Sequence, residues 1–169
     1  MVLVGPPGAG KSTVGPLLAD RLGVGFTDVD ELIVARAGRS ISEIFITDGE
    51  PVFREIEEVE VAAALAGRNG VLALGGGAVL SGRTRARLRG RCVVFLSVGM
   101  AEGVRRTGLS TARPLLAGVN PRATFAALLD ARLPLYREVA AVEVPTDGRD
   151  PAQVVEEVLT ATGAVRGTR

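Results

Sequence analysis

The sequence predicts an α/β fold in which a parallel sheet carries helices on both faces. The first observation is that short apolar runs alternate with stretches of helical periodicity along the chain, a pattern typical of such sheets. The second is that the first apolar run, Val2 to Val4, enters a glycine-rich loop that opens a helix. The third is the length of 169 residues, which suits one domain with its own core. We therefore expect a single domain over residues 1–169.

The glycine-rich loop has the sequence GPPGAGKST over residues 5–13 and matches the phosphate-binding pattern GxxxxGK[ST]. Glycines let the backbone turn tightly, so that its N–H groups can surround a phosphate. We expect Lys11 to reach the β- and γ-phosphates and the Ser12 hydroxyl to bind Mg²⁺, beside the positive end of the helix. The loop thus predicts a P-loop NTPase fold, and the expected ATP-binding residues are Gly8, Ala9, Gly10, Lys11, Ser12 and Thr13.

The alternative interpretation of this loop is a glycine-rich turn between a core strand and a core helix, with a lysine there by chance. The chain has 20 basic residues, and Lys11 is the one lysine among them. A compact ammonium fits among phosphate oxygens, where a planar guanidinium would be too bulky. The lysine at this position therefore favours the phosphate site.

The charges of the chain are balanced and well mixed, with 20 basic and 19 acidic residues and a formal net charge of +1. This composition predicts no binding to nucleic acid or to an anionic membrane surface. No apolar stretch approaches the roughly 20 residues that span a bilayer. No cationic leader precedes the first strand, so we expect a cytoplasmic protein. The one cysteine, Cys92, lies in the run CVVFLSV, where we expect a buried strand residue.

After the loop, apolar residues at helical spacing predict a helix over residues 11–22, with a slight kink or a looser turn at Pro16. A short strand is expected over residues 24–30. Because successive side chains of a strand alternate, Asp28 and Asp30 should lie on the same side of it.

The remainder of the chain continues this alternation. The further predicted helices cover residues 32–38, 41–46, 51–66, 83–89, 101–106, 121–133 and 151–161, and the further strands cover residues 71–74, 91–98 and 142–144. The helix at residues 41–46 is expected to begin in a capping box formed by Ser40 and Glu43. Residues 107–121 have no clean period and many helix breakers, which predicts a mobile lid.

Three consecutive glycines, Gly75 to Gly77, follow the apolar strand at residues 71–74. They indicate either a close approach of the backbone to another group or a mobile turn. This glycine turn, the loop at residues 5–13 and the two aspartates all follow strand ends. Because a parallel α/β sheet binds its ligands at the carboxyl ends of the strands, we expect all three to meet in one crevice.

A phosphotransferase needs a carboxylate that orients or deprotonates the attacking hydroxyl. Asp30 is the candidate for this role, and Asp28 is the candidate for holding Mg²⁺ through water. For both residues the alternative is a helix N-cap, because aspartate is a preferred capping residue.

Beyond these local patterns, the chain resembles the shikimate kinase family over nearly its whole length. The resemblance rests on the segments GPPGAGKST, DVDELI, SISEIFITDGEPVFREIEE, LALGGGA, GVRRTGLSTARPLL and ARLPLYREVA, in this order. It is most specific in FRxxE at residues 53–57, GGG at residues 75–77 and RxPxY at residues 132–136. The resemblance implies ATP-dependent phosphorylation of the 3-hydroxyl of shikimate, in the chorismate pathway to aromatic amino acids. It also implies a five-stranded parallel sheet of the nucleoside-monophosphate-kinase type, and we expect a monomer.

The same resemblance implies roles for individual residues. Asp30 would hold the acceptor hydroxyls, while Arg54 and Arg132 would hold the shikimate carboxylate. The implied substrate-binding set, from a subregion at about residues 28–66 and from later segments, is Asp30, Phe45, Phe53, Arg54, Glu57, Gly75, Gly76, Gly77 and Arg132. Arg113 would swing onto the phosphates from the lid and act in catalysis with Lys11 and Asp30. The residues around the adenine would be Arg106, Arg149 and Pro151.

Several residue assignments have alternatives. Arg54 could be a solvated residue of a helix face, and Phe45 and Phe53 could be simple core residues. Ala73 departs from the family, which often carries a hydroxyl or carboxylate there that assists the metal. Mg²⁺ would then depend more on Ser12, Asp28 and water.

Two other functions remain open from the sequence. A related P-loop kinase that acts on gluconate or a nucleoside monophosphate is the second hypothesis, since two arginines also hold a phosphate. An ATP-driven switch is the third. A GTPase is excluded, because guanine recognition by an NKxD motif needs a second lysine and the chain has none.

Overall fold

The computed structural model describes residues 1–67, 69–107 and 120–164, and within them five strands form one parallel sheet. The strands are β1 (Val2–Val4), β2 (Phe26–Asp28), β3 (Val71–Ala73), β4 (Val93–Ser97) and β5 (Val142–Pro145). Their order across the sheet is β2-β3-β1-β4-β5, and every neighbouring pair is parallel. The predicted α/β fold is confirmed.

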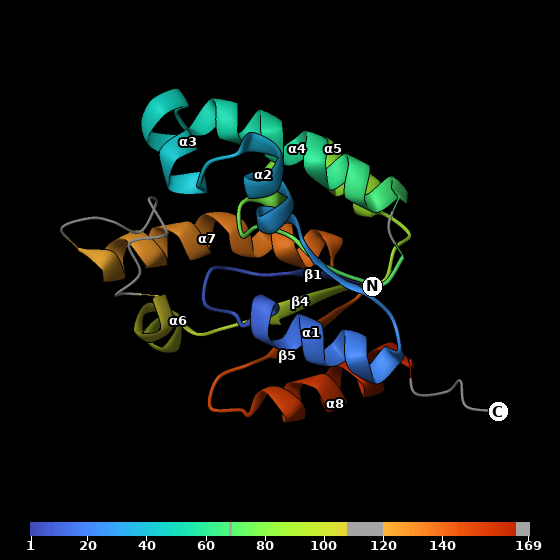
Figure 1. Ribbon diagram of the computed structural model, residues 1–169. Helices are drawn as coiled ribbons and strands as arrows, with labels where there is room; N and C mark the ends of the chain where they lie inside the picture. The colour runs from blue at the N-terminus through green and yellow to red at the C-terminus, as the bar shows by residue number, and fades with distance from the viewer. Residues whose placement is uncertain (68, 108–119, 165–169) are drawn as a thin grey trace.

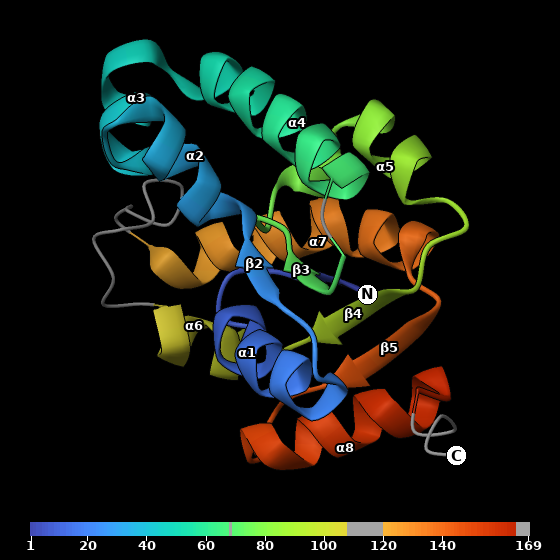
Figure 2. The same ribbon diagram turned by 45° about the vertical axis from the view of Figure 1, so that its right-hand side comes forward.

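Helices cover both faces of this sheet (Figure 1). They are α1 (Lys11–Leu22), α2 (Val29–Ala37), α3 (Ile41–Asp48), α4 (Glu50–Gly67), α5 (Gly82–Leu88), α6 (Met100–Thr107), α7 (Pro121–Val139) and α8 (Pro151–Thr162), with a short 3₁₀ helix η1 (Ala78–Leu80) before α5. Helices α4, α5 and α7 lie on one side of the sheet, and α1 and α8 lie next to each other on the other side (Figure 1, Figure 2). No helix in the described part of the chain is both long and apolar enough to cross a bilayer.

The sheet separates two apolar cores, because successive side chains of a strand point to opposite faces. Val2 and Val4 of β1 belong to the core that α4 and α7 cover, whereas Leu3 belongs to the core that α1 and α8 cover. All three side chains are buried. A strand buried on both faces reads as a continuous apolar run, which is why β1, β3 and β4 were visible in the sequence.

The central strand β1 lies where the direction of the crossovers reverses. The chain passes from β1 to β2 and β3 on one side, and then adds β4 and β5 on the other side. In open α/β sheets the ligands bind beyond the carboxyl ends of the strands at this switch point. The glycine-rich loop leaves β1 at that point, so the fold places it at the expected ligand crevice.

The predicted strand over residues 24–30 is wrong in extent. The structure limits β2 to Phe26–Asp28 and begins α2 at Val29, with Asp28 as the N-cap. The cause is a side-chain hydrogen bond, in which Oδ1 of Asp28 accepts the amide of Asp30 at 3.0 Å and so starts the helix. Asp28 and Asp30 therefore do not share a strand face, and of the two only Asp28 is a cap.

The expected burial of Cys92 is also wrong. The predicted strand at residues 91–98 is trimmed to β4, which begins at Val93, and Cys92 is exposed. Cys92 lies between the turn that follows α5 and the first residue of β4, and its backbone bonds to β1. Its carbonyl accepts the amide of Val2 at 2.9 Å.

Other local predictions are confirmed. The hydroxyl of Ser40 accepts the amide of Glu43 at 3.2 Å, and the carboxylate of Glu43 accepts the amide of Ser40 at 2.7 Å, which completes the predicted capping box. Helix α1 covers the predicted residues 11–22 with Pro16 inside it, and Gly23 caps it in the left-handed region with φ of 65°.

The predicted lid at residues 107–121 falls mostly outside the described residues, which resume at residue 120. Helix α6 ends at Thr107. Helix α7 begins at Pro121 with Asn120 as its N-cap, whose Oδ1 accepts the amide of Ala123 at 3.1 Å.

Helix α1 packs closely on β2 because Gly15 has no side chain. A Cβ at this position would lie 2.2 Å from Cε2 of Phe26. This contact lets the first turn of α1, which carries Ser12, lie next to the end of β2. The close approach therefore matters for the site as well as for the core.

We expect Gly15→Ala to lower the free energy of unfolding by about 1–3 kcal/mol, because the added methyl must displace the ring of Phe26. Gly25→Ala is the matched control, since a Cβ there meets nothing within 4 Å, and it should lose less than about 0.5 kcal/mol. Chemical denaturation of both variants provides the measurement. Equal values for the two variants would contradict the close contact of α1 with β2.

Candidate active site

The loop between β1 and α1 has the backbone geometry of an anion cradle. Gly8 and Gly10 have φ values of 80° and 92°, which favour glycine. A Cβ on Gly5 would lie 2.3 Å from the carbonyl oxygen of Leu96 in β4, so no other residue fits there. Gly10 is the N-cap of α1, so the positive end of the helix dipole faces the loop and favours an anion there. The predicted order of strand, loop and helix is confirmed.

Lys11, the first residue of α1, folds back onto this loop. Its Nζ donates to the carbonyl oxygens of Gly5 at 2.7 Å and Pro6 at 3.1 Å. The ammonium is therefore held at the cradle, where the phosphates of a nucleotide would offer it stronger, charged acceptors.

The two residues predicted to bind Mg²⁺ are in direct contact. The hydroxyl of Ser12 donates to Oδ2 of Asp28 at 2.9 Å. One hydroxyl and one carboxylate beside a phosphate cradle fit Mg²⁺, which prefers oxygen ligands and takes others from phosphate and water. Ala73, which pairs with Asp28 across the sheet, adds no ligand. Among the described residues, no group of three or more His, Cys, Asp or Glu is placed to hold a metal ion alone.

One cavity of about 580 Å³ brings together the P-loop, the two aspartates and the triple glycine, as predicted. Side chains of α4 and α7 complete it. The sequence-predicted site residues that line it are Gly8, Gly10, Lys11, Ser12, Thr13, Asp28, Asp30, Phe45, Phe53, Arg54, Glu57, Gly75, Gly76, Gly77, Arg106 and Arg132. The nucleotide candidates and the acceptor candidates thus share one cavity.

The buried carboxylate of Glu57 and the partly buried carboxylate of Asp30 pack against the glycine turn. A Cβ on Gly75 would lie 2.8 Å from Oδ1 of Asp30 and 2.5 Å from Oε1 of Glu57. Neither oxygen has a hydrogen-bond partner among the described residues. Burial, followed by the negative charges of Asp28 and Glu57, raises the pKa of Asp30 to about 6. Burial also raises the pKa of Glu57, although the guanidinium of Arg54 acts in the opposite direction.

Arg54 forms a wall of the cavity. Its Nη1 donates to Glu57 at 2.6 Å, and its Nε and Nη2 donate to Glu50 at 3.3 Å. The guanidinium also lies over the ring of Phe53, 5.1 Å from its centroid. A Cβ on Gly77 would lie 2.3 Å from both of its terminal nitrogens. The alternative of a solvated helix-face residue is therefore wrong for Arg54.

Arg132 reaches the same cavity from α7 and is only 6% exposed. The rings of Phe45 and Phe53 lie opposite on α3 and α4, with their centroids 4.7 Å apart. Phe53 is buried and also lines the cavity, so it is both a core residue and a site residue.

Sequence reasoning missed Tyr136, which does not line the cavity but bonds to the glycine turn that does. It lies one helical turn after Arg132, and its hydroxyl donates to the carbonyl oxygen of Gly76 at 2.5 Å. The signal that could have found it is the RxPxY pattern, which contains it. The remaining lining residues are Pro7, Ile41, Leu74 and Leu128. Nothing in these apolar residue types distinguishes them from core residues.

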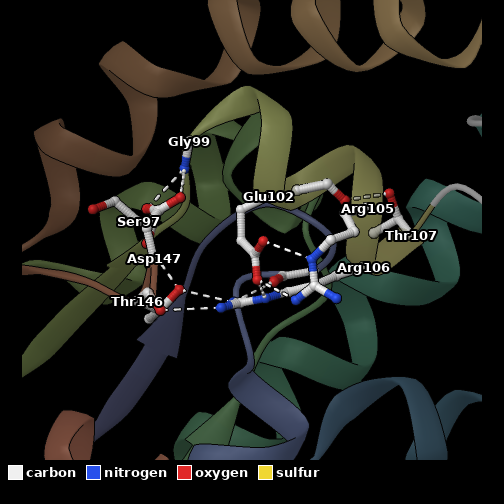
Figure 3. A network of polar contacts seen from close by, with 10 residues as sticks. Ser97, Gly99, Glu102, Arg105, Arg106, Thr107, Thr146 and Asp147 are labelled. Carbon is white, nitrogen blue, oxygen red and sulfur yellow. Dashed lines mark hydrogen bonds and ion pairs between the residues drawn. The ribbon is translucent and has the colours of Figure 1, made fainter. Parts of the chain in front are cut away.

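Arg106 lines the cavity and joins three segments of the chain (Figure 3). Its Nη1 donates to the carbonyl oxygen of Gly8 and to the hydroxyl of Thr146, both at 3.1 Å. Its Nε donates to Glu102, one turn earlier on α6, at 2.7 Å. Arg106 thus ties the P-loop to α6 and to the segment that follows β5.

Three other residues predicted to contact the nucleotide do not line the cavity. Arg149 forms an ion pair with Glu157 of α8. Pro151 is the first residue of α8, and Ala9 of the P-loop is fully buried. Arg113, the predicted lid arginine, lies outside the described residues.

We compared this chain with known protein families and with individual proteins. A family model described as shikimate kinase matches residues 7–162. This chain belongs to the shikimate kinase family. A shikimate kinase from Saccharopolyspora erythraea is 68% identical over 165 residues, which cover 98% of this chain and 94% of that protein. A shikimate kinase from Mycobacterium tuberculosis is 56% identical over 159 residues, which cover 94% of this chain and 90% of that protein.

Solved structures agree with this family assignment. The shikimate kinase from Acinetobacter baumannii in complex with shikimate has a TM-score of 0.94 and 37% identity, and the match covers 99% of this chain and 94% of that chain. A gluconokinase from Sinorhizobium meliloti has a TM-score of 0.60 and 20% identity over 97% of this chain and 91% of that chain, a likeness that shows the fold alone. The five-stranded P-loop kinase architecture of the shikimate kinase family is thereby confirmed.

The raised pKa of Asp30 predicts a pH-dependent loss of stability. A carboxyl group whose pKa rises from 3.8 to about 6 on folding stabilises the folded state below 3.8, and this contribution disappears as the pH rises through about 6. This pKa difference corresponds to a loss of about 3 kcal/mol in the free energy of unfolding, at ~1.4 kcal/mol per pKa unit. Asp30→Asn cannot ionise. We expect this variant to exceed the wild type in stability at neutral pH by about 1–3 kcal/mol, and to match it near pH 4.

Chemical denaturation across this pH range measures the difference. Asp20→Asn on the exposed face of α1 is the control for loss of one negative charge, and its offset from the wild type should be small. A wild type that is more stable than Asp30→Asn at neutral pH would contradict the burial of an uncompensated carboxylate.

Proposed function

We propose that this protein transfers the γ-phosphoryl group of ATP to the 3-hydroxyl of shikimate, which yields shikimate 3-phosphate in the pathway to aromatic amino acids. The observation that carries the proposal is the single cavity that combines a phosphate cradle with two arginines and an aspartate whose Oδ1 is buried. Shikimate is a small polyol with one carboxylate, so guanidinium groups and hydroxyl acceptors suit it. The shikimate complex of the similar Acinetobacter baumannii enzyme supports this substrate.

In this proposal Arg54 and Arg132 pair with the carboxylate of shikimate. Arg54 is already oriented by Glu50 and Glu57, and Arg132 is nearly fully buried. A substrate carboxylate would therefore enter a partly desolvated site with donors in place, where charge-assisted hydrogen bonds are strong. The other proposed acceptor contacts are Phe45, Phe53, Glu57 and the backbone of Gly75, Gly76 and Gly77.

Asp30 is the proposed acceptor of the 3-hydroxyl proton. With a pKa of about 6 the carboxylate is ionised at neutral pH and is a stronger base than an exposed aspartate. As the hydroxyl oxygen bonds to the γ-phosphorus, the bond to the β–γ bridging oxygen breaks and ADP leaves with that electron pair. Lys11 is placed to stabilise the charge on the transferring group.

Ser12 and Asp28 would hold Mg²⁺, with Asp28 acting through water. When bound, the ion neutralises charge on the β- and γ-phosphates. The backbone of residues 8–13 would bind the phosphates, and Arg106 would lie on the adenine side. Contacts of Arg113, Arg149 and Pro151 with the nucleotide stay predictions.

We further propose that residues 1–169 act as one kinase domain and as a monomer in the cytoplasm. The lid at residues 107–121 remains a prediction.

Acceptor-dependent ADP release tests the proposed function. With ATP and Mg²⁺, shikimate should drive ADP release at least about a hundredfold faster than gluconate or nucleoside monophosphates, because a site built around hydrogen bonds rejects poorly matched substrates. In the same assay Arg132→Ala should raise the KM for shikimate by about thirtyfold or more, the equivalent of ~2 kcal/mol for a lost charged contact, and should change the KM for ATP less than about twofold.

Arg137→Ala is the matched control for this arginine. Arg137 lies on the same helix but is exposed and pairs with Glu143, so the control should behave as the wild type does. Gluconate-driven turnover would contradict shikimate as the acceptor, and turnover that no acceptor increases would favour an ATP-driven switch. If Arg132→Ala raised the KM for shikimate and the KM for ATP equally, this arginine would belong to the nucleotide site.

A further inference from the structure

Tyr136 of α7 is fully buried in the core between α7 and the sheet. Its ring stacks on Phe95 of β4, with the centroids 5.0 Å apart and the planes inclined by 23°. Its hydroxyl donates to the carbonyl oxygen of Gly76 at 2.5 Å. Burial raises the pKa of Tyr136 to about 12, so the hydroxyl keeps its proton and remains a donor at every physiological pH.

The acceptor of this hydrogen bond lies between the two halves of the cavity. A Cβ on Gly76 would lie 3.0 Å from Cδ of Pro7 and 3.4 Å from the carbonyl oxygen of Gly5. Gly76 therefore packs directly on the P-loop on one side, while its carbonyl is held by Tyr136 on the other. The position of the glycine turn relative to the phosphate cradle depends on both contacts.

The donor of the bond is connected to the acceptor site through α7. Arg132 lies four residues before Tyr136, so the two side chains share one face of the helix, and Arg132 lines the cavity. Helix α7 lies between the α4 layer and the sheet (Figure 1), so it contacts both the acceptor side and the central strands. One hydroxyl thus links the helix of Arg132, the glycine turn and, through Gly76, the P-loop.

The hydroxyl is more than a packing group. Phenylalanine would fill the same space and stack on Phe95 without burying a polar atom, and a buried hydroxyl is favourable only when it is hydrogen-bonded. The bond joins residues that are 60 positions apart in the chain. A buried bond of this kind specifies one relative position of two segments.

We propose that Tyr136 is a positioning residue for phosphoryl transfer, whose hydroxyl sets the distance between the acceptor site and the phosphate cradle. The inference rests on the proposed function, because it concerns the alignment of the shikimate hydroxyl with the γ-phosphate. Tyr136 touches neither substrate in this role. It acts through the carbonyl of Gly76 and through α7.

The test is Tyr136→Phe, which keeps the ring and removes the hydroxyl. Each substrate keeps its own contacts, so KM for shikimate and for ATP should change less than about threefold. The variant loses the alignment of the shikimate hydroxyl with the γ-phosphate, so kcat should fall about tenfold or more. A misplacement of reacting groups by about 1 Å can lower a rate by up to about a hundredfold. Val158→Ala, a fully buried position of α8 in the other core, is the control for destabilisation alone and should keep the wild-type kcat.

A second measurement uses the wild type itself. The chain has one tyrosine and no tryptophan, so its intrinsic tyrosine fluorescence comes from Tyr136 alone. Saturation with shikimate in the absence of nucleotide should change this emission, because the acceptor contacts the turn that Tyr136 holds. If Tyr136→Phe does not fold, the change in tyrosine emission on shikimate binding tests the proposal instead.

The inference is overturned if folded Tyr136→Phe keeps kcat within about twofold of the wild type, or if its loss is no larger than that of Val158→Ala. An emission that shikimate leaves unchanged overturns it as well. A wild type without shikimate-dependent turnover counts against the proposed function instead, because that result does not involve Tyr136.

Discussion

The acceptor part of the cavity depends on a turn without side chains. Gly75 packs against the carboxylates of Asp30 and Glu57, and Gly77 packs against the guanidinium of Arg54, at distances that leave no room for a methyl group. The backbone of the turn therefore lies where side chains would otherwise block the charged groups. The same turn contacts the P-loop, so under the proposed function it determines how closely the acceptor can approach the phosphates.

The charged groups around this turn determine the chemistry of the site, and they also lower the stability of the folded protein. Burial makes Asp30 a stronger base, and it makes the ionised folded state less stable. Glu57 is buried as well, and the hydrogen bond from Arg54 at 2.6 Å offsets part of that burial. A substrate carboxylate that binds Arg54 must share it with Glu57. Under the proposed function, acceptor binding and the protonation state of these carboxylates are therefore coupled.

The features predicted well from the sequence are those encoded by neighbouring residues. The P-loop, the alternation of strands and helices, and the close approach of the backbone at the triple glycine all follow from local composition. The predicted end of β2 was wrong because the side chain of Asp28 accepts the amide of Asp30 and so competes with the strand for it. The bond from Tyr136 to Gly76 spans 60 residues, and no local pattern encodes such a contact. The RxPxY resemblance marked Tyr136 without indicating what it does.

The most direct test of the central role of the turn is calorimetric binding of shikimate and of ADP to Gly77→Ala. Gly77 has a φ of −97°, so alanine fits its backbone conformation, and the atoms nearest to the added methyl group belong to the guanidinium of Arg54. Because the guanidinium is the end of a flexible side chain, the protein should fold with Arg54 displaced. We predict at least tenfold weaker shikimate binding, about 1.4 kcal/mol or more, with ADP binding changed less than about twofold. Unchanged shikimate binding, or an equal loss for both ligands, would contradict the account.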